Sequence, residues 1–289
     1  MTEAQPNLHR RRLGLELRSL RKAAGQSLAE AAEQLDLPGA PSLSRIENGK
    51  QRVAPTSVLG FFEVYGLRDE QRRHHIRELA KLANTGRRSN LFNQYRHAIP
   101  DPFADYVQLE ELALKSETFA VVVPGLLQTE EYARAIVEGG RAWRHQREIQ
   151  NFVELRMARQ RTVFNRENPL QLWCVLDEAA LLRRVGSDAV MKAQLEHLLA
   201  LSEEFKHVDV QVLPFDQGAH AGVDGDFHLL HFAAGPPVAV VEPMTTSLYL
   251  EEDGHLARYE SGFDHLRTEA LNVRASREHI RTVLKERYS

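Results

Sequence analysis

The sequence predicts an all-α N-terminal domain followed by a larger α+β domain with a mainly mixed sheet. Apolar residues recur at helical spacing through about residues 10–83, whereas helical and strand-like runs alternate from residue 103 onward. Between these regions the polar stretch TGRRSN, residues 85–90, interrupts the helical pattern. We therefore expect one domain at residues 1–85, a linker at 86–101 and a second domain at 102–289.

The charge of the chain is distributed unevenly. Residues 1–90 contain 16 lysines and arginines against 10 aspartates and glutamates, a net charge of +6, although the whole chain has a net charge of -3. A basic segment attached to an acidic remainder suits a protein of which only one end binds a polyanion. Many proteins have a lopsided charge, so this observation alone identifies no partner.

Composition and targeting signals indicate a cytoplasmic protein. No apolar run approaches the roughly 20 residues that a membrane-spanning helix requires. The N-terminus lacks the apolar core of a signal peptide. The single cysteine, Cys174, lies in an apolar run and has no second cysteine to pair with, so we interpret it as a core residue.

Five short helices are expected in the N-terminal domain, at about residues 10–24, 27–35, 41–48, 56–65 and 69–83. Gly25 ends the first helix, and Ser27 with Glu30 three residues later forms a capping box at the start of the second. Pro41 suits the first turn of the third helix. Two short helices joined by a tight turn form a helix-turn-helix pattern, although any small helical bundle has similar periodicity.

The residues of the third helix are more specific than its periodicity. The strings LGLELR at 13–18, AAG at 23–25 and above all LSRIENGK at 43–50 resemble the Xre/Cro-type helix-turn-helix family. The resemblance implies a five-helix domain like that of lambda repressor, which binds double-stranded DNA sequence-specifically. It also implies that Glu47 forms a structural ion pair with a basic residue late in the first helix, here Arg21.

The third helix is expected to lie in the major groove with its N-terminal residues facing base edges. Leu43 and Ile46 point into the domain, so the outward-facing candidates for base contacts are Ala40, Pro41, Ser42, Ser44 and Arg45. Arg45 is the best candidate for bidentate reading of guanine, and a phosphate contact is the alternative. The family often has base-reading glutamines where this chain has Ala40 and Pro41, which indicates fewer hydrogen bonds to bases and contacts to thymine methyl groups instead.

Phosphate contacts are expected on both sides of this helix. Ser27 begins the second helix and should present backbone N–H groups to a phosphate. Lys50, Gln51 and Arg52 follow the third helix and should touch the DNA backbone, which fixes register without reading sequence. The run Arg10–Arg12 is either an arm that reaches DNA or a solvated helix start.

In the second domain we expect helices at about residues 105–118, 130–137, 144–165, 188–205 and 278–287, and strands at 119–123, 170–176, 208–213, 226–232, 238–241 and 247–250. The strings PFADYVQLE at 102–110, VPGLLQT at 123–129, LDEAAL at 176–181 and VLPF at 212–215 resemble the C-terminal domain of a large actinobacterial group of Xre-type regulators. That resemblance implies a transcription factor, often encoded beside a small acidic partner protein, and supplies no ligand.

The loop from Phe215 to Gly225 is the candidate effector or partner site, with a plain connecting loop as the alternative. It contains three glycines, and the polar and aromatic candidates in and beside it are Phe215, His220, Asp224 and Asp226. The spacing of its histidines matches no zinc pattern, and His228 and His231 should point to opposite faces of a strand. The pair Asp177–Glu178 is interpreted as helix capping and ion pairing.

No phosphate-binding loop, nucleophile elbow or dinucleotide fingerprint is present in the sequence. We therefore expect a protein that is not an enzyme, with no catalytic residues, metal or cofactor. The leading hypothesis is a homodimeric transcriptional regulator that reads an inverted-repeat operator and is controlled through its C-terminal domain. The alternatives are an antitoxin-like or anti-factor interaction protein that binds a small partner, and an enzyme tethered to DNA. The sequence does not decide whether a small-molecule effector binds.

Overall fold

The computed structural model describes residues 8–85, 95, 101–140, 145–233, 236–242 and 247–288, and it divides near residue 88 into two compact units. The first is all-α and the second is α+β with a mixed sheet, so the predicted fold classes are confirmed.

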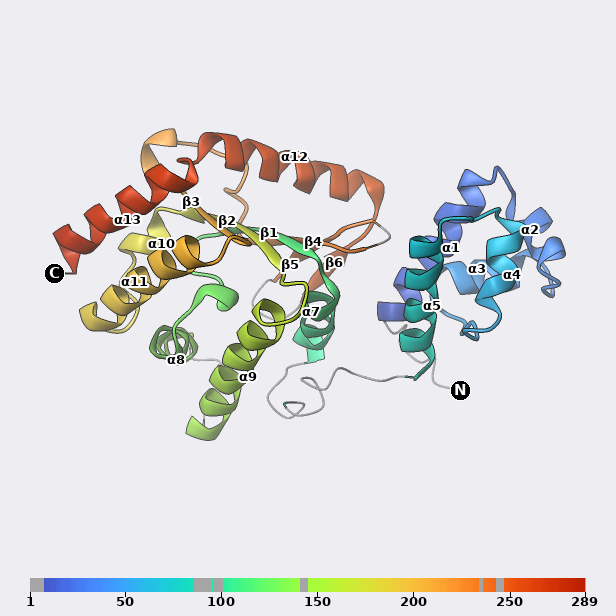
Figure 1. Cartoon of the computed structure of the whole chain (residues 1–289), viewed down its shortest axis with the longest axis horizontal. Helices are drawn as coiled ribbons and strands as arrows, with labels where there is room; N and C mark the ends of the chain where they lie inside the picture. Colours follow the sequence, from blue (N-terminus) through green and yellow to red (C-terminus); the bar gives the residue numbers. More distant parts are fainter. Residues whose placement is uncertain are drawn as a thin grey trace. The chain divides into compact units, whose positions relative to one another are not determined.

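The first unit consists of the five helices that the periodicity predicts: α1 (Leu8–Ala23), α2 (Leu28–Gln34), α3 (Ala40–Glu47), α4 (Val58–Val64) and α5 (Glu70–Thr85) (Figure 1). Its core is a single cluster in which Leu17, Leu43, Phe62 and Ile76 are fully buried. The run Arg10–Arg12 lies inside α1, where the side chain of Arg12 is buried. The alternative of a solvated helix start therefore does not hold for Arg12.

Helix α1 approaches the C-terminal end of α3 so closely that only glycine fits at the contact. A Cβ atom placed on Gly14 would lie 2.5 Å from the carbonyl oxygen of Glu47 and 2.6 Å from that of Ile46. Both neighbours are backbone atoms of a helix end, which cannot move aside as a flexible side chain could. The glycine in the string LGLELR is therefore required for the packing of α3.

The second unit is built on a six-stranded sheet with the order β3-β2-β1-β4-β5-β6. Strands β1 (Lys115–Ala120), β2 (Gln171–Asp177) and β3 (Val208–Leu213) are parallel to one another. Strands β4 (Phe227–His231), β5 (Val238–Val241) and β6 (Leu248–Leu250) continue the sheet in antiparallel pairs. The carboxyl ends of the three parallel strands therefore meet at one edge, where ligands often bind in open α/β sheets.

Helices cover both faces of this sheet (Figure 1). They are α7 (Asp101–Leu112), α8 (Glu130–Gly139), α9 (Gln146–Phe164), α10 (Ala179–Leu182), α11 (Asp188–Glu204), α12 (Asp253–Glu269) and α13 (Val273–Arg287), with single 3-10 turns η2 (Gly125–Leu127) and η3 (Phe215–Gln217). Leu256, Phe263 and Leu266 of α12 pack in one cluster with Phe119 and Phe227 of the sheet. On the opposite face the ring of Tyr106 in α7 lies 5.4 Å from the ring of His228 in β4.

Several predicted boundaries in this unit are wrong. The helix predicted at 105–118 runs from Asp101 to Leu112. The strand predicted at 119–123 is β1, which runs from Lys115 to Ala120. The first residues of β1 are polar, and pairing with β2 and β4 buries them in a way that local pattern does not indicate. The final helix begins at Val273 instead of 278.

Helix α12 was missed by the sequence analysis. Its apolar residues Leu256, Tyr259, Phe263 and Leu266 do follow helical spacing, but Gly254 and Gly262 lower its helix propensity. Packing of that apolar stripe against the sheet stabilises the helix in spite of the glycines.

We expect Gly14→Ala to lower the free energy of unfolding by about 1–3 kcal/mol, because the new methyl group overlaps rigid backbone atoms. Gly60→Ala is the matched control, since a Cβ there meets nothing within 4 Å and alanine favours the helix. Urea unfolding of both variants would test the contact. Equal stability of the two variants would contradict it.

Candidate nucleic-acid interface

The start of α2 carries the predicted capping box. Ser27 Oγ accepts a hydrogen bond from the backbone N–H of Glu30 at 3.2 Å, and Glu30 Oε2 accepts one from the N–H of Ser27 at 2.8 Å. The hydrogen bonds from Ser27 lower the pKa of the Glu30 carboxyl. Ser27 is exposed, so its phosphate contact stays a prediction that the geometry permits.

Helix α3 presents a smaller outward face than the sequence analysis predicted. Pro41 and Arg45 are exposed, and Ala40 and Ser44 are partly exposed. Ser42, predicted to face outward, is instead buried with 3% of its surface exposed. It lies one helical turn before the buried Ile46 and shares that residue's inward-facing edge of the helix.

Two side chains that follow α3, those of Asn48 and Gln51, are hydrogen bonded to residues of this helix. Asn48 Nδ2 donates to the carbonyl oxygen of Ser44 at 2.7 Å and to Ser44 Oγ at 3.3 Å. Gln51 Oε1 accepts from Arg45 Nε at 3.3 Å, and Gln51 Nε2 donates to Ser42 Oγ at 3.4 Å. Sequence reasoning placed Gln51 among the phosphate contacts and did not give Asn48 a role.

Basic side chains flank this face. Lys50 and Arg52 are exposed just beyond the end of α3, as a phosphate contact requires. Burial, together with the nearby charge of Arg52, lowers the pKa of the Arg10 guanidinium. The start of α1 therefore adds positive charge to the same region as the loop that follows α3.

The structural ion pair predicted between Arg21 and Glu47 is present and buried. Arg21 Nε lies 2.6 Å from Glu47 Oε1, and Arg21 Nη2 lies 3.0 Å from Glu47 Oε2. Their side chains are only 10% and 2% exposed. The hydrogen bond to Glu47 raises the pKa of the Arg21 guanidinium. The carboxylate thus joins the end of α3 to the end of α1.

A second arginine of α1 was missed by the sequence analysis. Arg18 Nε lies 3.4 Å from Glu47 Oε2, and Arg18 Nη2 donates to Asn48 Oδ1 at 2.7 Å. Arg18 precedes Arg21 by three residues and therefore lies on the same face of α1, which is the signal that could have revealed it. Through Arg18 the buried carboxylate is connected to the exposed Asn48.

In the second unit, the predicted loop residues lie at the carboxyl-end edge of the parallel strands. His220 Nε2 is 3.6 Å from Asp177 Oδ2 at the end of β2. Asp226 Oδ1 accepts from the backbone N–H of Val121 at 3.0 Å, just past the end of β1. Burial raises the pKa of the Asp226 carboxyl, and the nearby Asp177 carboxylate adds to that effect.

The remaining loop candidates face outward. Asp224 is exposed, and the Phe215 side chain is 55% exposed beside the end of β3. Val223, which the sequence analysis did not select, is 67% exposed in the same loop. The structure therefore brings together His220 and Asp226 with Asp177, and leaves two apolar side chains of the loop toward solvent.

Asp177 has the predicted capping role, and Glu178 lies within hydrogen-bond distance of a histidine. Asp177 Oδ1 accepts from the N–H of Ala179 at 2.8 Å, at the start of α10. Glu178 Oε1 lies 2.8 Å from His279 Nε2 of α13, and Glu178 Oε2 accepts from the N–H of Phe215 at 2.8 Å. The sequence showed no histidine partner for these carboxylates, because His279 is about a hundred residues away along the chain.

A buried polar cluster under α7 and α9 was also missed. Arg159 forms a bidentate ion pair with Glu110, with distances of 2.8 Å from Nε and 2.7 Å from Nη2. The Arg159 guanidinium lies 5.1 Å above the ring of Tyr106. Burial lowers the pKa of His228 to about 4, and its Nδ1 is 3.0 Å from Thr118 Oγ1. The residues of this buried cluster are far apart in the sequence, so the local sequence pattern does not connect them.

The two histidines of β4 point to opposite faces, as predicted. His228 contacts Tyr106 and Thr118, whereas His231 Nε2 lies 2.6 Å from Glu117 Oε2. Within the described ranges no three histidine, cysteine or acidic side chains are arranged to hold a metal ion. Cys174 is buried, and burial raises the pKa of its thiol, which agrees with the predicted core role.

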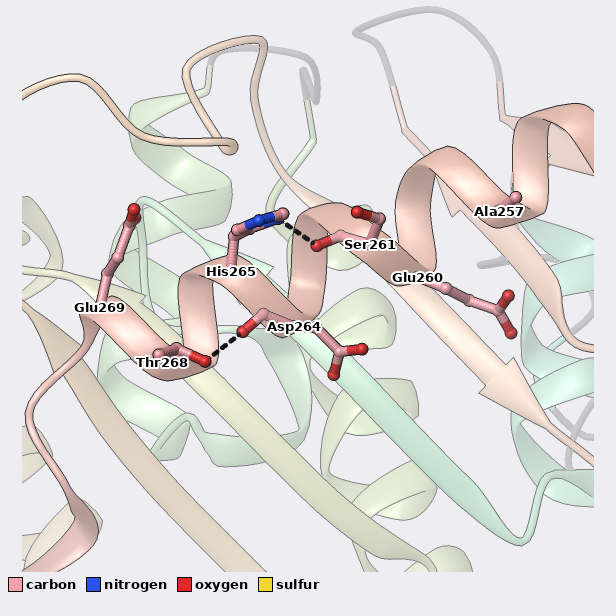
Figure 2. A pocket seen from close by; sticks show the side chains of 7 residues that line it. All are labelled: Ala257, Glu260, Ser261, Asp264, His265, Thr268 and Glu269. Atoms are coloured by element: carbon pink, nitrogen blue, oxygen red, sulfur yellow. Dashed lines mark hydrogen bonds between the residues drawn. The ribbon is translucent and has the colours of Figure 1, made fainter.

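A surface hollow of about 600 Å³ runs along one face of α12 (Figure 2). Its lining comes from this helix alone: Ala257, Glu260, Ser261, Asp264, His265, Thr268 and Glu269. Two of the polar side chains drawn there are hydrogen bonded within the helix: His265 Nδ1 lies 2.7 Å from the carbonyl oxygen of Ser261, and Thr268 Oγ1 donates to that of Asp264 at 2.8 Å. Among the described residues, no second element contributes a wall to the hollow.

Comparisons with known families match both units. Residues 12–75 match the family described as a helix-turn-helix domain, and residues 103–282 match the family described as a domain of unknown function (DUF5753). No curated protein and no solved structure matched the chain. Among the described helices, none is both long enough and apolar enough to cross a bilayer.

We expect Glu47→Gln to lower the free energy of unfolding by about 3–5 kcal/mol, because it leaves the buried Arg21 charge without its partner. Glu63→Gln is the matched control. Glu63 pairs with Arg73 at 3.0 Å but is 79% exposed, so its loss should cost about 1 kcal/mol or less. Thermal and denaturant unfolding would measure both, and a Glu47 variant as stable as the Glu63 variant would contradict the assigned role.

Proposed function

Because the chain belongs to the DUF5753 family and carries a helix-turn-helix domain ahead of that domain, we propose that it is a sequence-specific transcriptional regulator. The observation that carries the proposal is the outward face of α3, where Arg45 is exposed and Lys50 and Arg52 lie beside it. Such a face would combine a base-reading arginine with two cationic groups that can bind phosphates. The chain would be an Xre-type regulator of the actinobacterial group that its sequence resembles, acting in the cytoplasm and on the nucleoid.

The regulator would act as a homodimer on an inverted repeat. One α3 helix spans few base pairs, and two-fold dimers that place their recognition helices about one helical turn apart are the usual solution. The proposal assigns Ala40, Pro41, Ser44 and Arg45 to base edges. Ser27, Lys50 and Arg52 are assigned to the DNA backbone.

The second unit would supply the dimer contact and the control input. The geometry that supports a control site is the strand edge where His220 and Asp177 lie 3.6 Å apart and Asp226 is partly buried beside them. Edges of this kind are common ligand sites in sheets with parallel strands. We propose no catalytic role for this site, and the protein would not be an enzyme.

A second candidate function is an interaction protein whose second unit binds a small partner protein. The observation that favours it is the exposure of two large apolar side chains, Phe215 and Val223, in one loop. Co-purification of a small protein encoded by a neighbouring gene, lost in a Phe215→Ser/Val223→Ser variant, would support this candidate. The two candidates are compatible, because a partner on the second unit can regulate DNA binding by the first.

The proposed function is tested by capturing genomic DNA fragments on the purified protein at physiological salt and sequencing them. We expect one enriched inverted repeat with half-sites about 10 base pairs apart. Salt-sensitive capture of DNA without an enriched motif would contradict a specific regulator, because phosphate contacts alone give that result.

Substitutions on α3 and beyond it should separate base reading from phosphate binding. We expect Arg45→Ala to weaken operator binding by about 1–3 kcal/mol and to relax specificity at one base pair. Lys50→Ala should weaken binding to all sequences alike and reduce the salt dependence. Fluorescence anisotropy on operator and scrambled duplexes measures both, and identical behaviour of the two variants would remove Arg45 from the base contacts.

A further inference from the structure

Resting on the proposed function, we infer that Gln51 is a specificity-determining residue that positions Arg45 for base reading and is not a contact to the DNA backbone. The side chain of Gln51 joins the buried Ser42 to the exposed Arg45. Gln51 Nε2 donates to Ser42 Oγ at 3.4 Å, and Gln51 Oε1 accepts from Arg45 Nε at 3.3 Å. Both ends of the amide are thus engaged within the protein.

The turn after α3 fixes the place of Gln51. Gly49 has a φ of +67°, and a Cβ there would lie 2.8 Å from the backbone of Arg11. The N–H of Gly49 donates to the carbonyl oxygen of Ile46 at 2.9 Å, and the N–H of Lys50 donates to that of Arg45 at 2.8 Å. These are the two hydrogen bonds of a Schellman motif, which reverses the chain at a helix end. The reversal brings Gln51 back beside Arg45, where its own N–H reaches the Arg45 carbonyl at 3.2 Å.

The anchor of this arrangement is buried. Ser42 is 3% exposed and belongs to the inward edge of α3, so its hydroxyl has a fixed position. The amide of Gln51, which is only partly exposed, is therefore held at one end by a rigid group. Lys50 and Arg52, its neighbours on both sides, are exposed instead. Among these three residues, only Gln51 has its side chain turned toward α3.

The hydrogen bond to Gln51 leaves the reading end of Arg45 available. It uses the single N–H of Nε, and the four N–H groups on the two Nη atoms can still form the bidentate contact to guanine. A free arginine side chain has many rotamers, and ordering it on DNA lowers the affinity. Holding Arg45 before DNA arrives should therefore strengthen the contact to one particular base pair and leave binding to other DNA unchanged.

The test compares intact protein, Gln51→Ala, Arg45→Ala and the double variant on three duplexes: the operator, the operator with the base pair read by Arg45 replaced, and a scrambled sequence. We expect Gln51→Ala to lose about 3- to 10-fold in affinity for the operator and to match the intact protein on the other two duplexes. The double variant should bind the operator no more weakly than Arg45→Ala alone, because the two residues act as one unit.

Lys50→Ala is the matched comparison, since the neighbouring lysine is assigned to a phosphate and should lose affinity on all three duplexes. A Gln51→Ala variant that behaves like Lys50→Ala, or whose loss adds fully to that of Arg45→Ala, would overturn the inference. Either outcome would leave the proposed function standing. Failure to enrich any operator from genomic DNA would instead contradict the proposed function.

A second measurement needs no operator. In the free protein, ¹⁵N relaxation of the Arg45 Nε–H group reports how firmly the guanidinium is held. We expect its order parameter to fall in Gln51→Ala and also in Ser42→Ala, while the unfolding midpoints of both variants stay near that of the intact protein. An Arg45 side chain equally mobile in all three proteins would overturn the positioning role.

Discussion

The carboxylate of Glu47 holds the end of helix α3 against helix α1, and the position of the face proposed to read DNA depends on this contact. It lies at the last residue of α3, is 2% exposed and accepts hydrogen bonds from Arg21 at 2.6 Å and 3.0 Å. A helix of eight residues is marginal in isolation, so α3 owes its position to such tertiary contacts. Gly14 makes this contact close, because it lets the backbones of α1 and α3 approach without an intervening side chain.

The same carboxylate also connects the core to the surface that would meet DNA. Arg18 bridges Glu47 to Asn48, and Asn48 in turn bonds to Ser44 on the outward face. Gln51 in turn links the buried Ser42 to Arg45. Two short chains of hydrogen bonds thus run from the interior to the proposed reading residues. A surface ordered in this way loses less conformational entropy on binding.

The second unit has two groups of polar side chains, one buried against a face of the sheet and one at the edge where the parallel strands end. Glu110, Arg159 and His228 are enclosed between the sheet and the helices α7 and α9, where burial keeps His228 neutral at physiological pH. Asp177, His220 and Asp226 instead gather at the open edge where the parallel strands end. The buried cluster has its charges paired, so it fits a structural role. The edge cluster adjoins an exposed loop, which is where the proposed control site lies.

The sequence by itself determined the local structure: five helices in the first unit, the strand at Val208–Leu213, the capping box at Ser27, and the fold class of each unit. These features depend on periodicity and caps, which a few neighbouring residues specify. The resemblance of the third helix to a known family supplied the pair of Arg21 with Glu47. Only the tertiary structure decided that Ser42 is buried, that Gln51 faces Arg45, and that His220 meets Asp177. The position of Ser42 at the edge of a helix face and the folding-back of Gln51 depend on packing. His220 contacts Asp177, which lies 43 positions earlier in the chain, and the local sequence pattern does not specify a contact between such distant residues.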